Sequence, residues 1–457
     1  MLPLIPGRPG QDVAALDFLR GEGAQANDPA ADTLVAFNTY GPLLYNPAGA
    51  AGAAGSNGEW GAWHALCTRS GCNAPYDGLI TAAGTFVVGA QAGPTGIARG
   101  TNRGRRWQLR VDGYSASPFV ELGPVGPGGA PVILAGTGSF SGGTFRSAGD
   151  GAAGTWAPSA LAGGKFEALA VLPPSAALPG GRILAGVWNG ITYSDDGGLS
   201  YRPSSAFGQA AYIAWSFAFL SQAGHPYGGV TYAGVQTLSY GEFAGAEALR
   251  SDDGGATWVL AHHFTAAELE MPVPEYADVT EVVLLAAPDG VLWAGIGHRA
   301  EIPNRGGVMR STDGGVTWAR ADAGFRDASG RGYRVNQLRL SRTGVLYAAT
   351  ERGVWRTTAA VVASEAAPAE AAEIGVSVRP NPAGGRVEVV LTLAAAGPVR
   401  VAVVDALGRE VALVLDGAAR AGETVAAVET GAWPAGVYVV RVVAGSQTAA
   451  ARLVVAR

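Results

Sequence analysis

Four residues of this 457-residue chain, Glu167, Tyr212, Glu281 and Arg334, are of types that could act on a glycosidic bond. Each lies at the start of a short apolar segment that precedes a strand-like segment such as 183–186 (Ile-Leu-Ala-Gly). A pair of carboxylates together with tyrosine and arginine is a constellation that glycoside hydrolysis can use. The alternative, which we favour, is that these side chains are solvated polar groups that line a channel.

Histidine and the common catalytic motifs give no further site. His262 and His263 are adjacent and would face opposite sides of a strand, and His64, His225 and His298 are isolated. The sequence contains no Gly-x-Ser-x-Gly elbow, phosphate-binding loop or His-Glu-x-x-His motif. We therefore predict neither a metal site nor a cofactor.

The two cysteines, Cys67 and Cys72, lie in the short segment Cys-Thr-Arg-Ser-Gly-Cys. A turn-rich loop of this size can close as a disulfide in an oxidising compartment. A metal site would need more ligands than the nearby His64. We predict a disulfide, with free thiols or a metal site as the alternatives.

Composition indicates many short strands joined by tight turns. The chain has 69 glycines and 27 prolines, 48% apolar residues and only 15% charged residues. Its net charge of −5 and lack of a basic stripe argue against nucleic acid as a partner. No apolar run is long enough to span a membrane. The first residues lack the apolar core of a secretory signal, so we expect that Met1 is not the native start.

A repeat organises residues 30–358. In each copy a strand ending in Ala-Gly or a similar pair leads through a loop to a second strand and an aromatic residue. Anchors at Phe37, Gly89, Gly136, Gly186, Gly234, Gly295 and Ala349 are 52, 47, 50, 48, 61 and 54 residues apart. Such spacing is typical of one four-stranded blade per repeat. We predict a β-propeller of seven blades, with six or eight as alternatives, in which the four candidate residues approach one another near the axis.

Three of the repeats share a Ser-x-Asp-x-Gly turn that is followed by tryptophan or tyrosine. The residues concerned are Ser194, Asp196, Gly198, Ser251, Asp253, Gly255, Trp258, Ser311, Asp313, Gly315 and Trp318. This turn resembles the Asp box of the bacterial neuraminidase repeat, which occurs in sialidases, sortilin-type receptors, xyloglucan-cleaving glycosidases and photosystem-assembly propellers. An aspartate in such a turn can accept backbone hydrogen bonds, glycine permits its backbone geometry, and the tryptophan can bury a large apolar area. We therefore predict a structural rather than a catalytic role for these residues.

The repeat ends near Thr358. Residues 359–373 are rich in Ala, Glu and Pro and are predicted to be a linker, while residues 1–29 are predicted to be an N-terminal extension. Residues 374–457 alternate apolar and polar positions between turns, which predicts a small antiparallel β-sandwich.

Four motifs in this C-terminal region occur in a characteristic order. They are 380–382 (Pro-Asn-Pro), 404–410 (Val-Asp-Ala-Leu-Gly-Arg-Glu), 434–441 (Pro-Ala-Gly-Val-Tyr-Val-Val-Arg) and 453–457 (Leu-Val-Val-Ala-Arg). The region resembles the type A C-terminal sorting domain of the type IX secretion system. The alternative is a generic β-sandwich binding module. The resemblance implies that residues 374–457 engage the type IX machinery and that the protein is secreted or held at the outer-membrane surface.

Two main functions are compatible with the sequence, and a structural role in the cell envelope is a third. The one we favour is a non-catalytic, monomeric propeller that binds a glycan or a surface protein. The alternative is a secreted glycoside hydrolase, sialidase-like or xyloglucanase-like, that uses Glu167 and Glu281. The sialidase Arg-Ile-Pro motif is missing, since 301–303 reads Glu-Ile-Pro. In the longest repeat, the acidic segment 268–278 is our candidate for a recognition loop.

Overall fold

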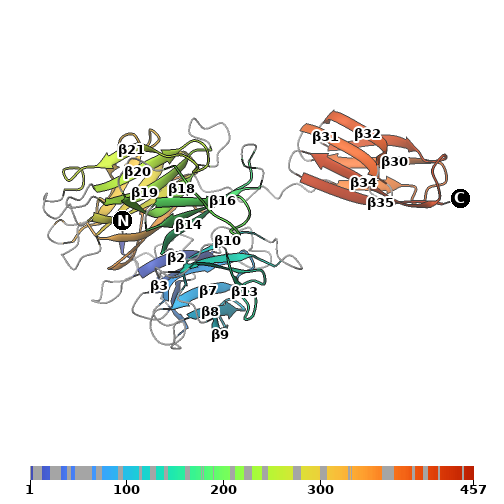
Figure 1. Cartoon of the computed structure of the whole chain (residues 1–457). Coiled ribbons are helices and arrows are strands. Elements are labelled where there is room, and N and C mark those ends of the chain that lie inside the picture. The colour runs from blue at the N-terminus through green and yellow to red at the C-terminus, as the bar shows by residue number, and fades with distance from the viewer. Residues whose placement is uncertain are drawn as a thin grey trace, which may run out of the picture. The chain divides into compact units, whose positions relative to one another are not determined.

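The computed structural model divides the chain into two compact units, Met1–Glu365 and Ala366–Arg457. The boundary lies inside the range predicted to be a linker. All regular elements among the described residues are β-strands (Figure 1). The described residues are 2–3, 13–20, 32–38, 43–46, 64–67, 75–90, 96–112, 116–123, 130–137, 143–159, 165–175, 178, 180–188, 190–205, 211–220, 229–238, 245–270, 279–298, 306–327, 330, 332–362, 375–393, 397–404, 410–419, 422–444 and 447–456.

The described strands of the first unit form seven four-stranded antiparallel groups. The first three groups, in strand order, are β2(Val13–Leu19), β3(Thr33–Asn38), β4(Leu43–Asn46) and β5(His64–Cys67); β6(Pro75–Ile80), β7(Phe86–Ala90), β8(Gly96–Thr101) and β9(Arg106–Asp112); and β10(Ala116–Glu121), β11(Ile133–Thr137), β12(Thr144–Ser147) and β13(Trp156–Pro158).

The remaining groups follow the same order along the chain. They are β14(Phe166–Leu172), β15(Arg182–Val187), β16(Gly190–Ser194) and β17(Arg202–Pro203); β18(Ala211–Phe219), β19(Thr231–Leu238), β20(Gly245–Ser251) and β21(Val259–Phe264); β22(Val279–Ala286), β23(Leu292–His298), β24(Gly307–Ser311) and β25(Ala319–Arg320); and β26(Val335–Leu340), β27(Leu346–Thr350), β28(Gly353–Arg356) and β1(Leu2–Pro3). This arrangement confirms the predicted all-β propeller. One parallel pair, Gly190 with Ile213, joins the fourth and fifth groups into a single sheet.

The predicted N-terminal extension, residues 1–29, is wrong in its described part. Strand β2 pairs with β3 and is the first strand of the first group, and β1 pairs with β28 and completes the seventh. The sequence concealed this because β2 carries no turn motif of its own. The propeller is therefore closed by a strand from the N-terminal end of the sequence and three strands from residues 335–356.

The first strand of each group pairs along one edge with the second strand of its own group, and apart from the Gly190–Ile213 pair of β18 no ladder is formed along its other edge among the described residues. Side chains from adjacent groups bond these other edges. Gln337 accepts a hydrogen bond from the Leu16 amide at 2.6 Å, and Ser216 bonds both the Val282 carbonyl and the Leu284 amide at 2.8 Å. These three edge groups thereby find partners outside their own sheets. The first strands consequently form the inner ring of the propeller.

The three Ser-x-Asp turns share one hydrogen-bond pattern. In the sixth group the Ser311 hydroxyl donates to Asp313 at 2.8 Å and accepts from the Gly315 amide at 2.9 Å. Asp313 also accepts from the Thr317 amide at 2.9 Å, and the Trp318 indole donates to the Gly315 carbonyl at 3.0 Å. The turns at Asp196 and Asp253 make the equivalent serine and backbone bonds. The carboxylates thus hold the turns of their own hairpins.

Apolar side chains fill the interfaces between neighbouring groups. Between the fifth and sixth, Phe264 and Trp318 pack with ring centroids 5.3 Å apart around the fully buried Tyr232. Between the sixth and seventh, Phe325 packs edge-on against Trp355 at 5.2 Å. Rings of this size bury a large apolar area, so these interfaces supply much of the propeller's stability.

The second unit is the predicted antiparallel sandwich. One sheet has the order β29(Gly375–Arg379), β30(Arg386–Leu393), β33(Gly422–Glu429), and the other has the order β32(Glu410–Ala419), β31(Gly397–Val404), β34(Gly436–Ala444), β35(Gln447–Val455). Valines and leucines of both sheets form its core. Asn381 fixes the start of the unit to β35, because its side chain donates to the Arg452 carbonyl at 2.6 Å and accepts from the Val454 amide at 2.9 Å.

Candidate functional site

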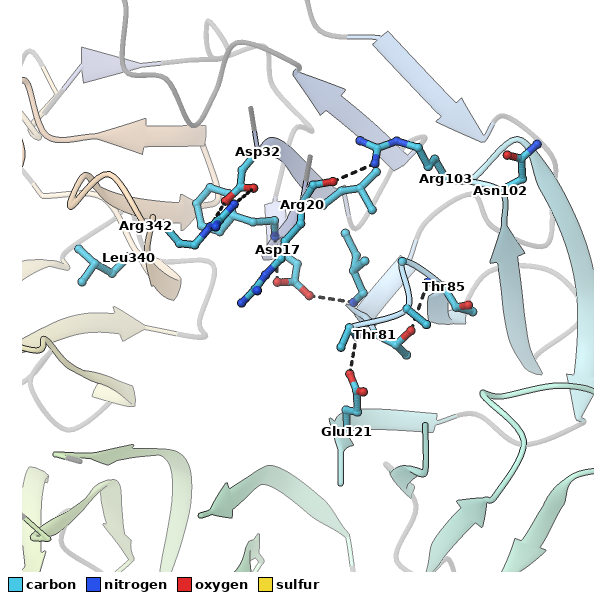
Figure 2. Close-up of a pocket in the computed structure, with 16 residues that line it drawn as sticks. Asp17, Arg20, Asp32, Thr81, Thr85, Asn102, Arg103, Glu121, Leu340 and Arg342 are labelled. Atoms are coloured by element: carbon cyan, nitrogen blue, oxygen red, sulfur yellow. Dashed lines mark hydrogen bonds and ion pairs between the residues drawn. The ribbon is translucent and has the colours of Figure 1, made fainter. Parts of the chain in front are cut away.

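A cavity of about 670 Å³ lies in the first unit, at the end of the inner strands that carries the Ser-x-Asp turns. Its walls come from the ends of β2, β10 and β26 and from the hairpin that joins β6 to β7 (Figure 2). Binding sites for small ligands are commonly of this size and combine an apolar lining with a few polar groups. Those polar groups define the chemistry of the site.

Two carboxylates, Asp17 of the first group and Glu121 of the third, bond the same hairpin of the second group (Figure 2). Asp17 accepts hydrogen bonds from the Ile80 amide at 2.8 Å and from the Phe18 amide at 2.9 Å. Glu121 accepts from the Ala82 amide at 2.8 Å. The intervening Thr81 amide bonds the Thr85 carbonyl within the hairpin. The two carboxylates therefore bind alternate amides along one edge of the chain.

Burial dominates the ionisation of these acids. Burial raises the pKa of Asp17, although Arg339 and the two backbone hydrogen bonds oppose the shift. Burial likewise raises the pKa of Glu121, and the nearby Asp150 and Asp17 carboxylates raise it further. A ligand that brings hydrogen-bond donors or positive charge would stabilise the ionised form of both carboxyl groups.

A third acid, Asp77, lies on the inner strand β6 below the cavity. Burial raises its pKa to about 6, against the hydrogen bonds from the Gly78 and Phe119 amides and the charge of Arg339. Its contacts run from the second group to the third and belong to the inner ring rather than to the cavity wall. The raised pKa of Asp77 therefore reflects its burial within the inner ring.

Arginines supply the positive charge of the site. Arg342 binds Asp32 through two hydrogen bonds, of 2.7 and 2.6 Å, so this buried carboxylate is neutralised. Arg103 donates to the Arg20 carbonyl at 2.8 Å, which ties the second group to the end of β2. The Arg20 side chain is exposed and extends toward the open centre of the ring (Figure 2).

The hairpin wall is held from behind by Asp150. Its carboxylate accepts hydrogen bonds from Thr81 at 3.2 Å and Thr85 at 2.5 Å and pairs with Arg99 at 2.8 Å. Asp150 lies in the third group's turn, where the repeat is irregular, and it binds the neighbouring group instead of its own turn. This irregular copy thus positions the hairpin that Asp17 and Glu121 bind.

The residues that sequence reasoning proposed lie elsewhere. Glu167, Tyr212, Glu281 and Arg334 all lie at the opposite end of their inner strands from the cavity. Glu281 and Arg334 are neighbours, because a side chain built on Gly297 would meet both, at 3.2 and 3.1 Å.

The other two candidates belong to a different part of the ring. Glu167 forms an ion pair with Lys165, and the Tyr212 ring is buried, with its hydroxyl beside Gly190. This pair belongs to the fourth and fifth groups, whereas Glu281 lies in the sixth group and Arg334 directly precedes the first strand of the seventh. Whether these residues act on a substrate stays a prediction.

The cavity carboxylates escaped the sequence search for a physical reason. Asp17 lies in the second half of inner strand β2 and Glu121 at the end of inner strand β10, whereas the search followed the first positions of such strands. The segment containing Asp17 was also assigned to an extension. The available signal was an acidic residue near the end of an otherwise apolar strand, as in Val-Ala-Ala-Leu-Asp-Phe-Leu.

Two further predictions meet different outcomes. In the acidic segment 268–278, Glu268 binds the Thr265 amide and hydroxyl, and Glu270 pairs with Arg326 at 2.7 Å. These two carboxylates hold local structure, while residues 271–278 lie outside the described part. The Cys67–Cys72 disulfide also lies outside it, since only the backbone of Cys67 is described.

Comparison with known proteins identifies the second unit. Residues 377–456 match the family model of the secretion system C-terminal sorting domain. This domain directs export through the type IX system, so the protein is secreted or displayed at the cell surface. No helix among the described residues is long and apolar enough to cross a membrane. No curated protein matches the chain.

Solved structures resemble the chain in fold only. The GH74 enzyme of Niastella koreensis is 13% identical, with a TM-score of 0.53 over 86% of this chain and 59% of that one. The extracellular domain of a protein described as a one-component system from B. thetaiotaomicron is 10% identical, with a TM-score of 0.52 over 87% of this chain and 45% of that one. The chain thus spans about half the length of these two structures.

Proposed function

We propose that this protein is an exported propeller that binds a glycan in the cavity at the Ser-x-Asp end of its channel and does not cleave it. The observation that carries the proposal is the engagement of the cavity carboxylates. Asp17 and Glu121 accept backbone hydrogen bonds, and Asp32 is paired with Arg342. Fixed acceptors of this kind suit the recognition of hydroxyl groups.

In a glycoside hydrolase, two carboxyl groups must take part in the reaction itself. One must deliver a proton to the leaving oxygen, and the other must activate water or attack the sugar. A carboxylate that already accepts backbone amides at 2.8 Å is restricted in its approach to a substrate. The same physical argument assigns the Ser-x-Asp carboxylates, including Asp313, to a structural role, because each is bonded within its own turn.

The neighbouring Glu281 and Arg334 support the second candidate, a glycoside hydrolase that acts at the opposite mouth. It makes a different prediction: Glu281→Gln would abolish turnover of a glycan, whereas Glu121→Gln would not.

The test is a glycan-array measurement on the full chain, followed by a hydrolysis screen of every glycan that binds. Binding without release of reducing ends is the expected result. Turnover that is lost in Glu281→Gln or Glu167→Gln would overturn the proposal in favour of the hydrolase. An empty array would direct the search to protein partners and would also contradict the glycan assignment.

A further inference from the structure

The two cavity carboxylates bond the same hairpin at nearby positions. Asp17 and Glu121 bond the amides of Ile80 and Ala82, which are two residues apart. Ile80 ends strand β6 and Ala82 lies in the turn that follows, so the two carboxylates bond the backbone on either side of Thr81. An ammonium group has three donors and can therefore form charge-assisted hydrogen bonds with two carboxylates at once.

Arginines neutralise some of the acidic residues around Asp17 and Glu121 but not all of them. Asp32 is neutralised by Arg342, Asp150 by Arg99, and Asp17 lies near Arg339. Glu121 has no ion pair within the described part of the chain, and burial, together with the neighbouring Asp150 and Asp17 carboxylates, holds its pKa above the ordinary value. The side of the cavity near Glu121 therefore lacks a positive charge.

The remaining walls of the cavity add groups that suit a polyol. Asn102 offers a donor and an acceptor, and the exposed Arg20 offers donors only. A lysine side chain of a protein partner would bring one ammonium group and leave these polar groups without partners. An amino sugar brings both the ammonium group and several hydroxyls, and a cavity of about 670 Å³ has room for more than one ring.

We propose that the cavity binds a glycan through a protonated amino group, held between Glu121 and Asp17, with sugar hydroxyls on Asn102 and Arg20. This inference rests on the proposed glycan-binding function and names the substrate class of the same site. An N-acetylated sugar of the same size lacks the positive charge and is expected to bind more weakly.

The experiment compares two trisaccharides, of glucosamine and of N-acetylglucosamine, by calorimetry on the full chain. The glucosamine trimer is expected to bind at least about tenfold more tightly, as a charge-assisted hydrogen bond contributes. Glu121→Gln keeps an oxygen for the Ala82 amide and removes the charge, so it should abolish this preference. The matched control is Asp252→Asn, which removes an exposed carboxylate from a turn of the fifth group and should leave the preference unchanged.

Each other outcome contradicts the inference. Equal binding of the two trimers, or a preference that survives Glu121→Gln, would leave the glycan-binding function standing and overturn the amino-sugar assignment. Binding of an oligolysine peptide with no binding of the glucosamine trimer would show that the carboxylates serve a protein partner. Absence of any glycan on the array would remove the proposed function itself, which separates the two failures.

Discussion

Asp77→Asn is expected to stabilise the propeller at neutral pH. The Asp77 carboxylate has a pKa of about 6 in the folded protein, compared with 3.8 for an aspartate in the unfolded chain, because burial disfavours its ionised form. Below pH 3.8 the group is protonated in both states and carries no penalty. Between pH 3.8 and about 6 the unfolded chain has lost this proton while the folded state still holds it, so stability falls as the pH rises across this window and stays lower above it.

The magnitude follows from the size of the shift. A difference of about 2 pKa units corresponds to about 3 kcal/mol at pH 7.5. Asparagine keeps an oxygen for the Gly78 and Phe119 amides and carries no charge, so the substitution removes this penalty. The figure of about 3 kcal/mol is therefore an upper bound on the gain in stability. For a unit that ends at Glu365, an unfolding entropy of about 2.1 cal/mol/K per residue converts 3 kcal/mol into a rise in Tm of about 4 °C.

The assay is thermal unfolding of wild type and variant from pH 3.5 to pH 8. We expect the two proteins to converge near pH 3.5 and to separate progressively up to about pH 7. A variant that is less stable than wild type at pH 7.5 would refute the argument, because the hydrogen bonds of the carboxylate would then outweigh its burial. A gain that is equal at pH 3.5 and pH 7.5 would also refute it, since it could not come from ionisation.

Three further substitutions test other parts of the structure. In Asp313, burial raises the pKa, but hydrogen bonds from Thr317, Ser311 and Val316 outweigh it and lower the pKa to about 2. Asp313→Asn should therefore destabilise the propeller by about 1–2 kcal/mol at pH 7, with the loss shrinking as the pH falls toward 2; an unchanged Tm at pH 7 would contradict this. Asp150→Ala removes the bonds to Thr81, Thr85 and Arg99, so hydrogen exchange should accelerate in residues 81–85 while the Asp313 turn is unaffected; unchanged exchange would show that the hairpin is held by other contacts. Asn381→Ala removes two hydrogen bonds to β35 and should lower the stability of the second unit by about 1–2 kcal/mol and the secreted fraction with it; normal secretion of a destabilised variant would separate folding of this unit from export.

Much of the fold could be predicted because the same turn residues recur at regular intervals along the sequence. Turn residues such as Asp253 and Asp313 recur at fixed offsets from glycine and tryptophan, since each bonds its own hairpin. Local constraints of this kind leave a signal in every copy. The first group lacks the turn motif, so its inner strand β2 was assigned to an extension although it pairs with β3.

The candidate site was harder to predict because it depends on contacts between groups. Asp17 bonds a hairpin 63 residues away, and Glu121 bonds the same hairpin from 39 residues away. Neither spacing is periodic, and the residues belong to copies in which the repeat is weakest. Asp150 illustrates the point, because the irregular turn that obscures the repeat is the one that supports the cavity wall.

The measurement that tests the central claim most directly is a crystal structure of the full chain with a ligand taken from the glycan array. We predict an intact glycan in the cavity, in contact with Asp17 and Glu121, and an unoccupied opposite mouth. A glycan beside Glu281 and Arg334, or one that has been cleaved, would contradict the account.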